Sequence, residues 1–240
     1  MKEGYTHISV VLDRSGSMSS CKSDVIGGYN QLIEDQKKAE GTATLTLAQF
    51  DTEYEVLSDM VDLKSIEAMT NQSYVPRGST ALLDAIGRTI VDTESKILGM
   101  DEKDRPENVI FVIITDGEEN GSRNTSRDQA MQMINSHRTE KQWEFVFIGA
   151  NQDAIRGGAS IGVRASSAMT YDSTGIGTRA MYTTLSDSLS TYRSKKFTGV
   201  QDKMDYKFFD DGSKDEPKKD IPPKGDKKAI DTYTQGPLTF

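Results

Sequence analysis

Cysteine and long apolar runs are scarce in this 240-residue sequence. Its one cysteine, Cys21, cannot form an internal disulfide, which fits a reducing compartment. No stretch approaches the roughly 18 consecutive apolar residues that a transmembrane helix needs. Residues 1–5 carry no apolar signal segment either. We therefore expect a cytoplasmic protein.

Histidine and the common catalytic motifs are also in short supply. The two histidines are His7, at the start of a predicted strand, and His137, late in a predicted helix. No Gly-x-Ser-x-Gly elbow is present for a nucleophilic serine. No Gly-x-Gly-x-x-Gly follows the first apolar run, as dinucleotide binding requires. These absences predict that the protein is not an enzyme.

An excess of positive charge is missing as well. The chain has 29 Lys and Arg against 37 Asp and Glu, which gives a net charge of −8. Nucleic acids and anionic membrane surfaces attract basic proteins, so we expect neither as a partner. An apolar content of 35% over this length is enough for one sizeable core.

What the chain does have is an apolar run that ends in oxygen-bearing side chains. Residues 8–12 read as a buried strand, and Asp13, Ser15 and Ser17 follow at once. Ligands of open α/β sheets bind at the carboxyl ends of the strands. Three hard oxygens at this spacing suit Mg²⁺, which prefers oxygen ligands and few carboxylates.

Two later stretches offer further oxygens in comparable places. Thr80 opens a predicted helix after the loop glycine Gly78, and Asp116 follows the apolar strand 109–115. Taken alone, Asp13 and the two serines would equally suit a helix cap. Their combination with Thr80 and Asp116 favours a metal site.

These motifs resemble the metal-ion-dependent adhesion site of von Willebrand factor A (vWA) domains. The matching residues are Asp13-x-Ser15-x-Ser17, Thr80 and Thr115-Asp116-Gly117, in this order, and the resemblance runs from about Thr6 to Lys195. Residues 145–154 and 177–180 look like a stand-alone prokaryotic or phage-type branch of the family.

The resemblance implies a Mg²⁺-dependent protein-binding module, with Mn²⁺ or Ca²⁺ as alternative ions. Ser15, Ser17 and Thr80 would bind the metal directly, and Asp13 and Asp116 mainly through water. A Glu or Asp of a partner protein would then complete the coordination.

The residues beside this site have two interpretations each. A solvated loop is the main interpretation of Glu118, Glu119 and Asn120. Arg77 either steers an acidic partner group or is an ordinary surface arginine.

The order of elements predicts a doubly wound, mostly parallel α/β sheet with one antiparallel edge strand and helices on both faces. Helices are expected over 19–39, 63–69, 80–98, 125–138 and 174–193. A hairpin is expected to join strands 42–50 and 54–57, and the glycines at 27 and 28 are expected to pack against the sheet.

The expected domain organisation follows from these elements. Residues 1–195 would form the vWA-like domain. Residues 196–240, with four of the six prolines, would form a disordered or loosely docked tail.

Two other functions stay open at this point. Asp13 and Asp116 could support metal-assisted hydrolysis, although no general base is placed beside them. A haloacid-dehalogenase-like phosphohydrolase would need a second Asp where Ser15 stands. Alternatively, the tail could mediate assembly or self-association, for example with Asp210 or Asp211 reaching the metal of another copy.

Overall fold

One mixed sheet of six strands runs through the computed structural model, which describes residues 1–150 and 154–209. The strand order is β3-β2-β1-β4-β5-β6, and only β3 runs antiparallel to its neighbour. The predicted fold class, including the antiparallel edge hairpin, is confirmed. The strands are β1 (Lys2–Asp13), β2 (Thr42–Phe50), β3 (Tyr54–Asp62), β4 (Pro106–Thr115), β5 (Glu144–Ala150) and β6 (Ala168–Tyr171).

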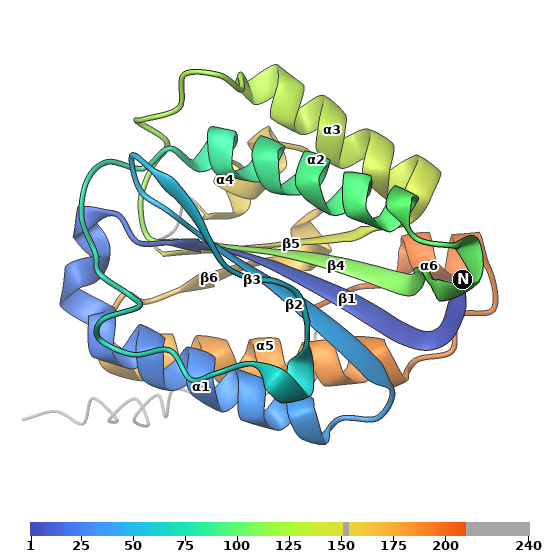
Figure 1. Ribbon diagram of the computed structural model, residues 1–240. Helices are drawn as coiled ribbons and strands as arrows, with labels where there is room; N and C mark the ends of the chain where they lie inside the picture. The colour runs from blue at the N-terminus through green and yellow to red at the C-terminus, as the bar shows by residue number, and fades with distance from the viewer. Residues whose placement is uncertain (151–153, 210–240) are drawn as a thin grey trace, which may run out of the picture. The chain divides into compact units, whose positions relative to one another are not determined.

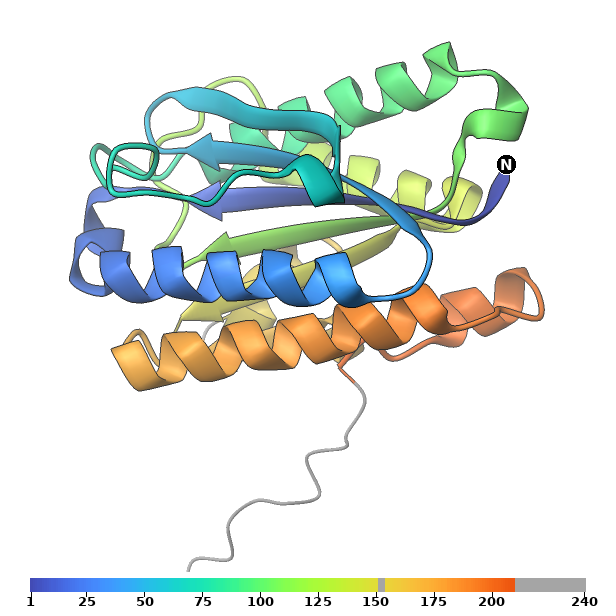
Figure 2. The ribbon, with the colours of Figure 1, turned by 60° about the horizontal axis from the view of Figure 1, so that its bottom comes forward.

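Helices cover both faces of the sheet (Figure 1). One face carries α1 and α5, which lie side by side in Figure 2, and the other carries α2, α3 and the short α4. Among the described residues, no helix is long and apolar enough to cross a membrane. The α-helices are α1 (Lys22–Lys38), α2 (Leu82–Gly99), α3 (Arg127–Lys141), α4 (Ala154–Ser160), α5 (Gly175–Ser194) and α6 (Val200–Asp205). The 3₁₀ helices are η1 (Gly16–Cys21), η2 (Leu63–Ser65), η3 (Glu102–Asp104) and η4 (Ala165–Ser167).

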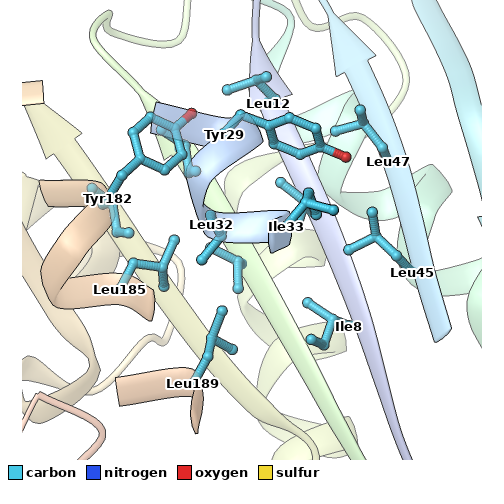
Figure 3. Packing of buried hydrophobic residues seen from close by; sticks show 14 of the residues in the cluster. Ile8, Leu12, Tyr29, Leu32, Ile33, Leu45, Leu47, Tyr182, Leu185 and Leu189 are labelled. Atoms are coloured by element: carbon cyan, nitrogen blue, oxygen red, sulfur yellow. The ribbon is translucent and has the colours of Figure 1, made fainter. Parts of the chain in front are cut away.

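The sheet separates two apolar cores, because successive side chains of a strand point to opposite faces. From β1, Ile8 and Leu12 join the core beneath α1 and α5, whereas Val11 joins the core beneath α2 and α3. Figure 3 shows side chains of α1 and α5 gathered over β1 and β2 in the first core. Burial on both faces explains why the central strands are almost continuously apolar.

The glycine pair in α1 has a different role from the predicted one. A Cβ on Gly28 would lie 2.2 Å from Cδ2 of Tyr182, on α5, so this glycine lets the two helices approach closely. A Cβ on Gly27 would meet nothing within 4 Å. The close contact is therefore between α1 and α5 and not between α1 and the sheet.

Several predicted boundaries shift. The helix expected from residue 19 begins at Lys22, after η1, and the one expected over 63–69 is only η2. The helix expected from Thr80 begins at Leu82, because both backbone groups of Thr80 are bound elsewhere, as described below.

The chain beyond Lys195 continues along the fold for part of the predicted tail. It forms α6, and Phe208 is buried among residues of the core beneath α1 and α5. The rings of Phe197 and Tyr206 pack against Tyr192 of α5 in tilted and edge-on arrangements. The rest of the predicted tail, 210–240, with Asp210 and Asp211, lies outside the described residues.

The strand order places the candidate site. In the sheet, β2 lies on one side of β1 and β4 lies on the other side. The direction in which the chain adds strands therefore reverses between β1 and β4. The two strands are parallel, with Leu12 opposite Ile114. Asp13, the last residue of β1, and Asp116, directly after β4, therefore lie at the same edge of the sheet, where open α/β sheets bind ligands.

Candidate metal centre

Asp13 is the last residue of β1 and is completely buried. Its Oδ1 accepts a hydrogen bond from the Ser15 backbone N–H at 2.6 Å, and its Oδ2 accepts one from Thr115 Oγ1 at 2.6 Å. The hydroxyl of Tyr74 donates to the Asp13 carbonyl oxygen at 2.7 Å. Contacts from three segments thus fix both the backbone and the carboxylate of Asp13.

The two serines connect the β1 loop to the β4 loop. Ser15 Oγ and Ser17 Oγ lie 3.1 Å apart, and Ser17 Oγ donates to Asp116 Oδ1 at 2.6 Å. Ser15 is buried, Ser17 is exposed and Asp116 is partly exposed. The group is therefore open to solvent on the side of Ser17.

Thr80 comes to the same place from a third segment. A Cβ placed on Gly117 would lie 3.1 Å from Thr80 Oγ1, 3.7 Å from Ser17 Oγ and 3.9 Å from Asp13 Oδ2. Oxygens from three loops thus surround one point beside a residue that has no side chain. Together with the Ser15–Ser17 and Ser17–Asp116 contacts, this geometry brings all five predicted residues together.

The donor set fits a small hard cation. It comprises three hydroxyls and two carboxylates, all oxygen. Among residues 1–150 and 154–209, no three His, Cys, Asp or Glu side chains gather as a metal cluster. A cation at this point would therefore depend on the hydroxyls. Burial raises the pKa of both Asp13 and Asp116, because their charged forms are poorly solvated, and a nearby divalent ion would offset that cost.

Asn120 and Glu119 hold Thr80 and the start of α2, a role that the interpretation of a solvated loop missed. Asn120 Oδ1 accepts from the Thr80 N–H at 2.8 Å, and the Thr80 carbonyl accepts from the N–H groups of Asn120 and Gly121. Glu119 accepts from the Leu83 N–H at 2.9 Å, at the first turn of α2. An acidic side chain at a helix N-terminus is favourable, but the sequence does not reveal which helix it meets.

Asp51, directly after β2, links the loop that follows β1 to the loop that carries Thr80. This buried carboxylate accepts from Arg14 Nε and from Arg77 Nε, both at 2.9 Å. Burial alone would raise the pKa of Asp51. Hydrogen bonds from Glu53 N–H and Arg77, with the charges of Arg14 and Arg77, outweigh burial and lower it. Arg77 therefore anchors a loop, and its side chain remains half exposed at 52%.

The loop between Arg77 and Thr80 needs a glycine. Gly78 has a φ of +67°, which L side chains rarely adopt, and a Cβ there would lie 2.7 Å from Thr52 Oγ1. The Thr52 hydroxyl also accepts from the Ser79 N–H at 3.0 Å. The loop that contains Gly78 thus turns tightly before Thr80 and packs against the β2–β3 turn.

Comparison with known proteins identifies the fold. No family model and no curated protein matches this chain. Solved structures do match: the vWF domain of the type V pili tip protein Mfa5 from Porphyromonas gingivalis has a TM-score of 0.57 at 10% identity over 81% of this chain and 98% of that one. Manganese-loaded TRAP protein from Plasmodium vivax has a TM-score of 0.52 at 17% identity, covering 72% of this chain and 70% of the other.

A third match is proximal thread matrix protein 1 from the mussel byssus, with a TM-score of 0.55 at 14% identity. It covers 74% of this chain and 46% of the mussel protein, so this chain spans about half of that relative's length. Another structure of the mussel protein has a zinc-occupied MIDAS motif, the metal-ion-dependent adhesion site. At these identities the matches establish a vWA-like α/β fold.

Proposed function

We propose that this chain is a Mg²⁺-dependent protein-binding module. Ser15, Ser17 and Thr80 would donate hydroxyl oxygens to the ion, and Asp13 and Asp116 would act mainly through bound water. An aspartate or glutamate of a partner protein would complete the coordination. The observation that carries this proposal is the convergence of oxygens from three loops on the point beside Gly117.

The chemistry of the oxygens supports this function. Uncharged hydroxyl ligands leave a divalent ion with most of its positive charge, so it retains affinity for an incoming carboxylate. Ser17 is exposed, which gives a partner access from that side. The likeness to a manganese-loaded protein and to one with a zinc-occupied MIDAS motif adds support, and Mn²⁺ and Ca²⁺ are proposed as alternative ions.

We propose no enzymatic activity, and the surroundings of the two histidines support this. The ring nitrogens of His7 contact the hydroxyls of Thr44 and Ser9, and His137 Nδ1 contacts the Met133 carbonyl. Neither ring is thereby placed as a general base at Asp13. We further propose a cytoplasmic location and no nucleic-acid or membrane partner. Self-association through residues 196–240 stays a separate proposal.

The direct test is metal binding followed by partner capture. Mn²⁺ titration by electron paramagnetic resonance should show one tight site in the wild type and none in Asp13→Asn. Asp35→Asn, a partly exposed change on α1, is the matched control and should bind like the wild type. Capture from lysate should then retain a partner in Mg²⁺ that is lost in EDTA and with Asp13→Asn. Equal Mn²⁺ binding by all three proteins would overturn the proposal.

A further inference from the structure

A cavity of about 510 Å³ opens directly beside the candidate metal centre. Asp116 and Gly117 line it, so one wall is shared with the point on which the site oxygens converge. Its volume lies within the range of pockets that enclose ligand groups, about 300–1,000 Å³. A group bound at the metal would therefore stand at the mouth of a second, unassigned space.

Apolar side chains form part of the inner surface of this cavity, and polar groups form the rest. Leu82 and Leu83 contribute from the start of α2, Phe147 from β5 and Ile161 from the turn after α4. Gly157 of α4 also lines the cavity and supplies no side chain. The apolar part of this surface binds water weakly and favours contact with an apolar group.

Charged side chains surround the mouth. Glu118 and Glu119 lie on the metal side, and Arg127 and Arg156 contribute from α3 and α4. Glu119 accepts hydrogen bonds from Leu83 N–H, Gly121 N–H and Ser122, so its charge is already satisfied within the protein. The rim thus has a basic side, with Arg127 donating to Ser160 Oγ, opposite the carboxylates of Asp116 and Glu118.

We propose that this cavity selects the partner by taking a bulky apolar side chain next to the metal-binding acidic residue. The inference rests on the proposed metal-dependent function and deepens it. Neighbouring residues have Cα atoms 3.8 Å apart, and the cavity begins at Asp116, so an adjacent residue can reach it. The preferred partner is therefore a protein segment in which Glu or Asp is followed by a residue such as Phe or Leu.

The experiment uses three capped dipeptides as probes: acetyl-Glu-Phe-amide, acetyl-Glu-Gly-amide and acetyl-Gln-Phe-amide. Each is titrated into the ¹⁵N-labelled full chain with Mg²⁺, and dissociation constants are read from amide shifts. Acetyl-Glu-Phe-amide should bind at least about tenfold more tightly than acetyl-Glu-Gly-amide, because the ring leaves water. Acetyl-Gln-Phe-amide should bind weakly, since it offers the metal no carboxylate.

Filling the cavity provides the second arm. A Cβ on Gly157 would lie 3.5 Å from Phe147 Cζ, an ordinary contact, so Gly157→Leu should fold and occupy the space. It should abolish the advantage of acetyl-Glu-Phe-amide while leaving Mn²⁺ affinity and acetyl-Glu-Gly-amide binding unchanged. Gly27→Leu, also a helical glycine but exposed on α1, is the matched control and should preserve the advantage.

The outcomes separate the two proposals. Equal Mg²⁺-dependent binding of both glutamyl peptides would overturn the cavity proposal and leave the metal-dependent function standing. A preference for Phe that survives Gly157→Leu would also overturn it. Absence of Mn²⁺ binding by the wild type would instead refute the proposed function on which the inference depends.

Discussion

The carboxylate of Asp51 should stabilise both the fold and the metal-site loops. Asp51→Asn keeps the shape of the side chain and removes its charge. Arg14, with a side chain 5% exposed, would then lose one of its two anionic partners. Removing one member of a buried ion pair costs about 3–5 kcal/mol, because the other charge stays buried. Glu55 still contacts Arg14, so we expect the lower end, about 3 kcal/mol.

The same change should weaken metal binding. Asp51 joins Arg14, which lies between Asp13 and Ser15, to Arg77, which lies three residues before Thr80. Loss of this link gives the Thr80 loop more freedom, so ordering it around the ion costs more. We expect urea unfolding monitored by circular dichroism to show the lost stability. Mn²⁺ titration below the unfolding range should show reduced affinity.

Glu53→Gln provides the control for Asp51→Asn. Glu53 contacts the same Arg77, but its side chain is 72% exposed. Exposed ion pairs contribute little, so this variant should unfold and bind Mn²⁺ like the wild type. A loss below about 1 kcal/mol in Asp51→Asn would refute the assigned role of the buried pair. Unchanged Mn²⁺ affinity in a measurably destabilised Asp51→Asn would refute the coupling to the site.

Two further predictions concern buried polar groups. Tyr74→Phe removes the hydrogen bond to the Asp13 carbonyl and should cost about 1–3 kcal/mol in urea unfolding. Tyr29→Phe is its control and should cost nothing, because the buried Tyr29 hydroxyl has no partner among the described residues. Burial lowers the pKa of His7 from 6.5 to about 3, so between these values the unfolded chain binds a proton that the folded chain excludes. The free energy of unfolding should therefore decrease as the pH is lowered across this window, by about 2.5 kcal/mol between pH 7.5 and pH 4.5. The loss should be absent from His7→Asn, and an equal loss in that variant would contradict the assignment.

Local sequence was enough to locate the strands and the candidate ligands of the β1 and β4 segments. Continuous β-branched runs specify strands buried on both faces, and the oxygens after β1 and β4 must meet because these strands are parallel neighbours. The resemblance supplied the link to Thr80, which comes from a third segment. Helix propensity could not predict that α2 begins at Leu82, because a tertiary hydrogen bond to Asn120 holds the backbone of Thr80.

The residues that sequence interpretation missed act over long distances in the chain. Glu119 is an acid in a polar loop, and only the folded arrangement brings it to the first turn of α2. Arg77 has its partner 26 residues away, at the end of β2. Similarly, Phe208 lies in a segment whose composition predicts a tail, yet it is buried against the core. In each case the deciding contact depends on tertiary structure, which no local pattern encodes.

The three site loops are joined in pairs by contacts within the protein itself. Ser17 and Asp116 join the β1 and β4 loops, Asp51 joins the β1 loop to the Thr80 loop, and Asn120 joins Thr80 to the β4 loop. A cation at their meeting point would therefore enter a largely preorganised set of oxygens, with little ordering cost to offset its binding. The remaining cost is the burial of Asp13 beside Asp116, whose charge further raises its pKa, and a divalent ion lowers this cost directly. On this reasoning, the scaffold holds the oxygens, and the proposed ion would supply the charge that an acidic partner recognises.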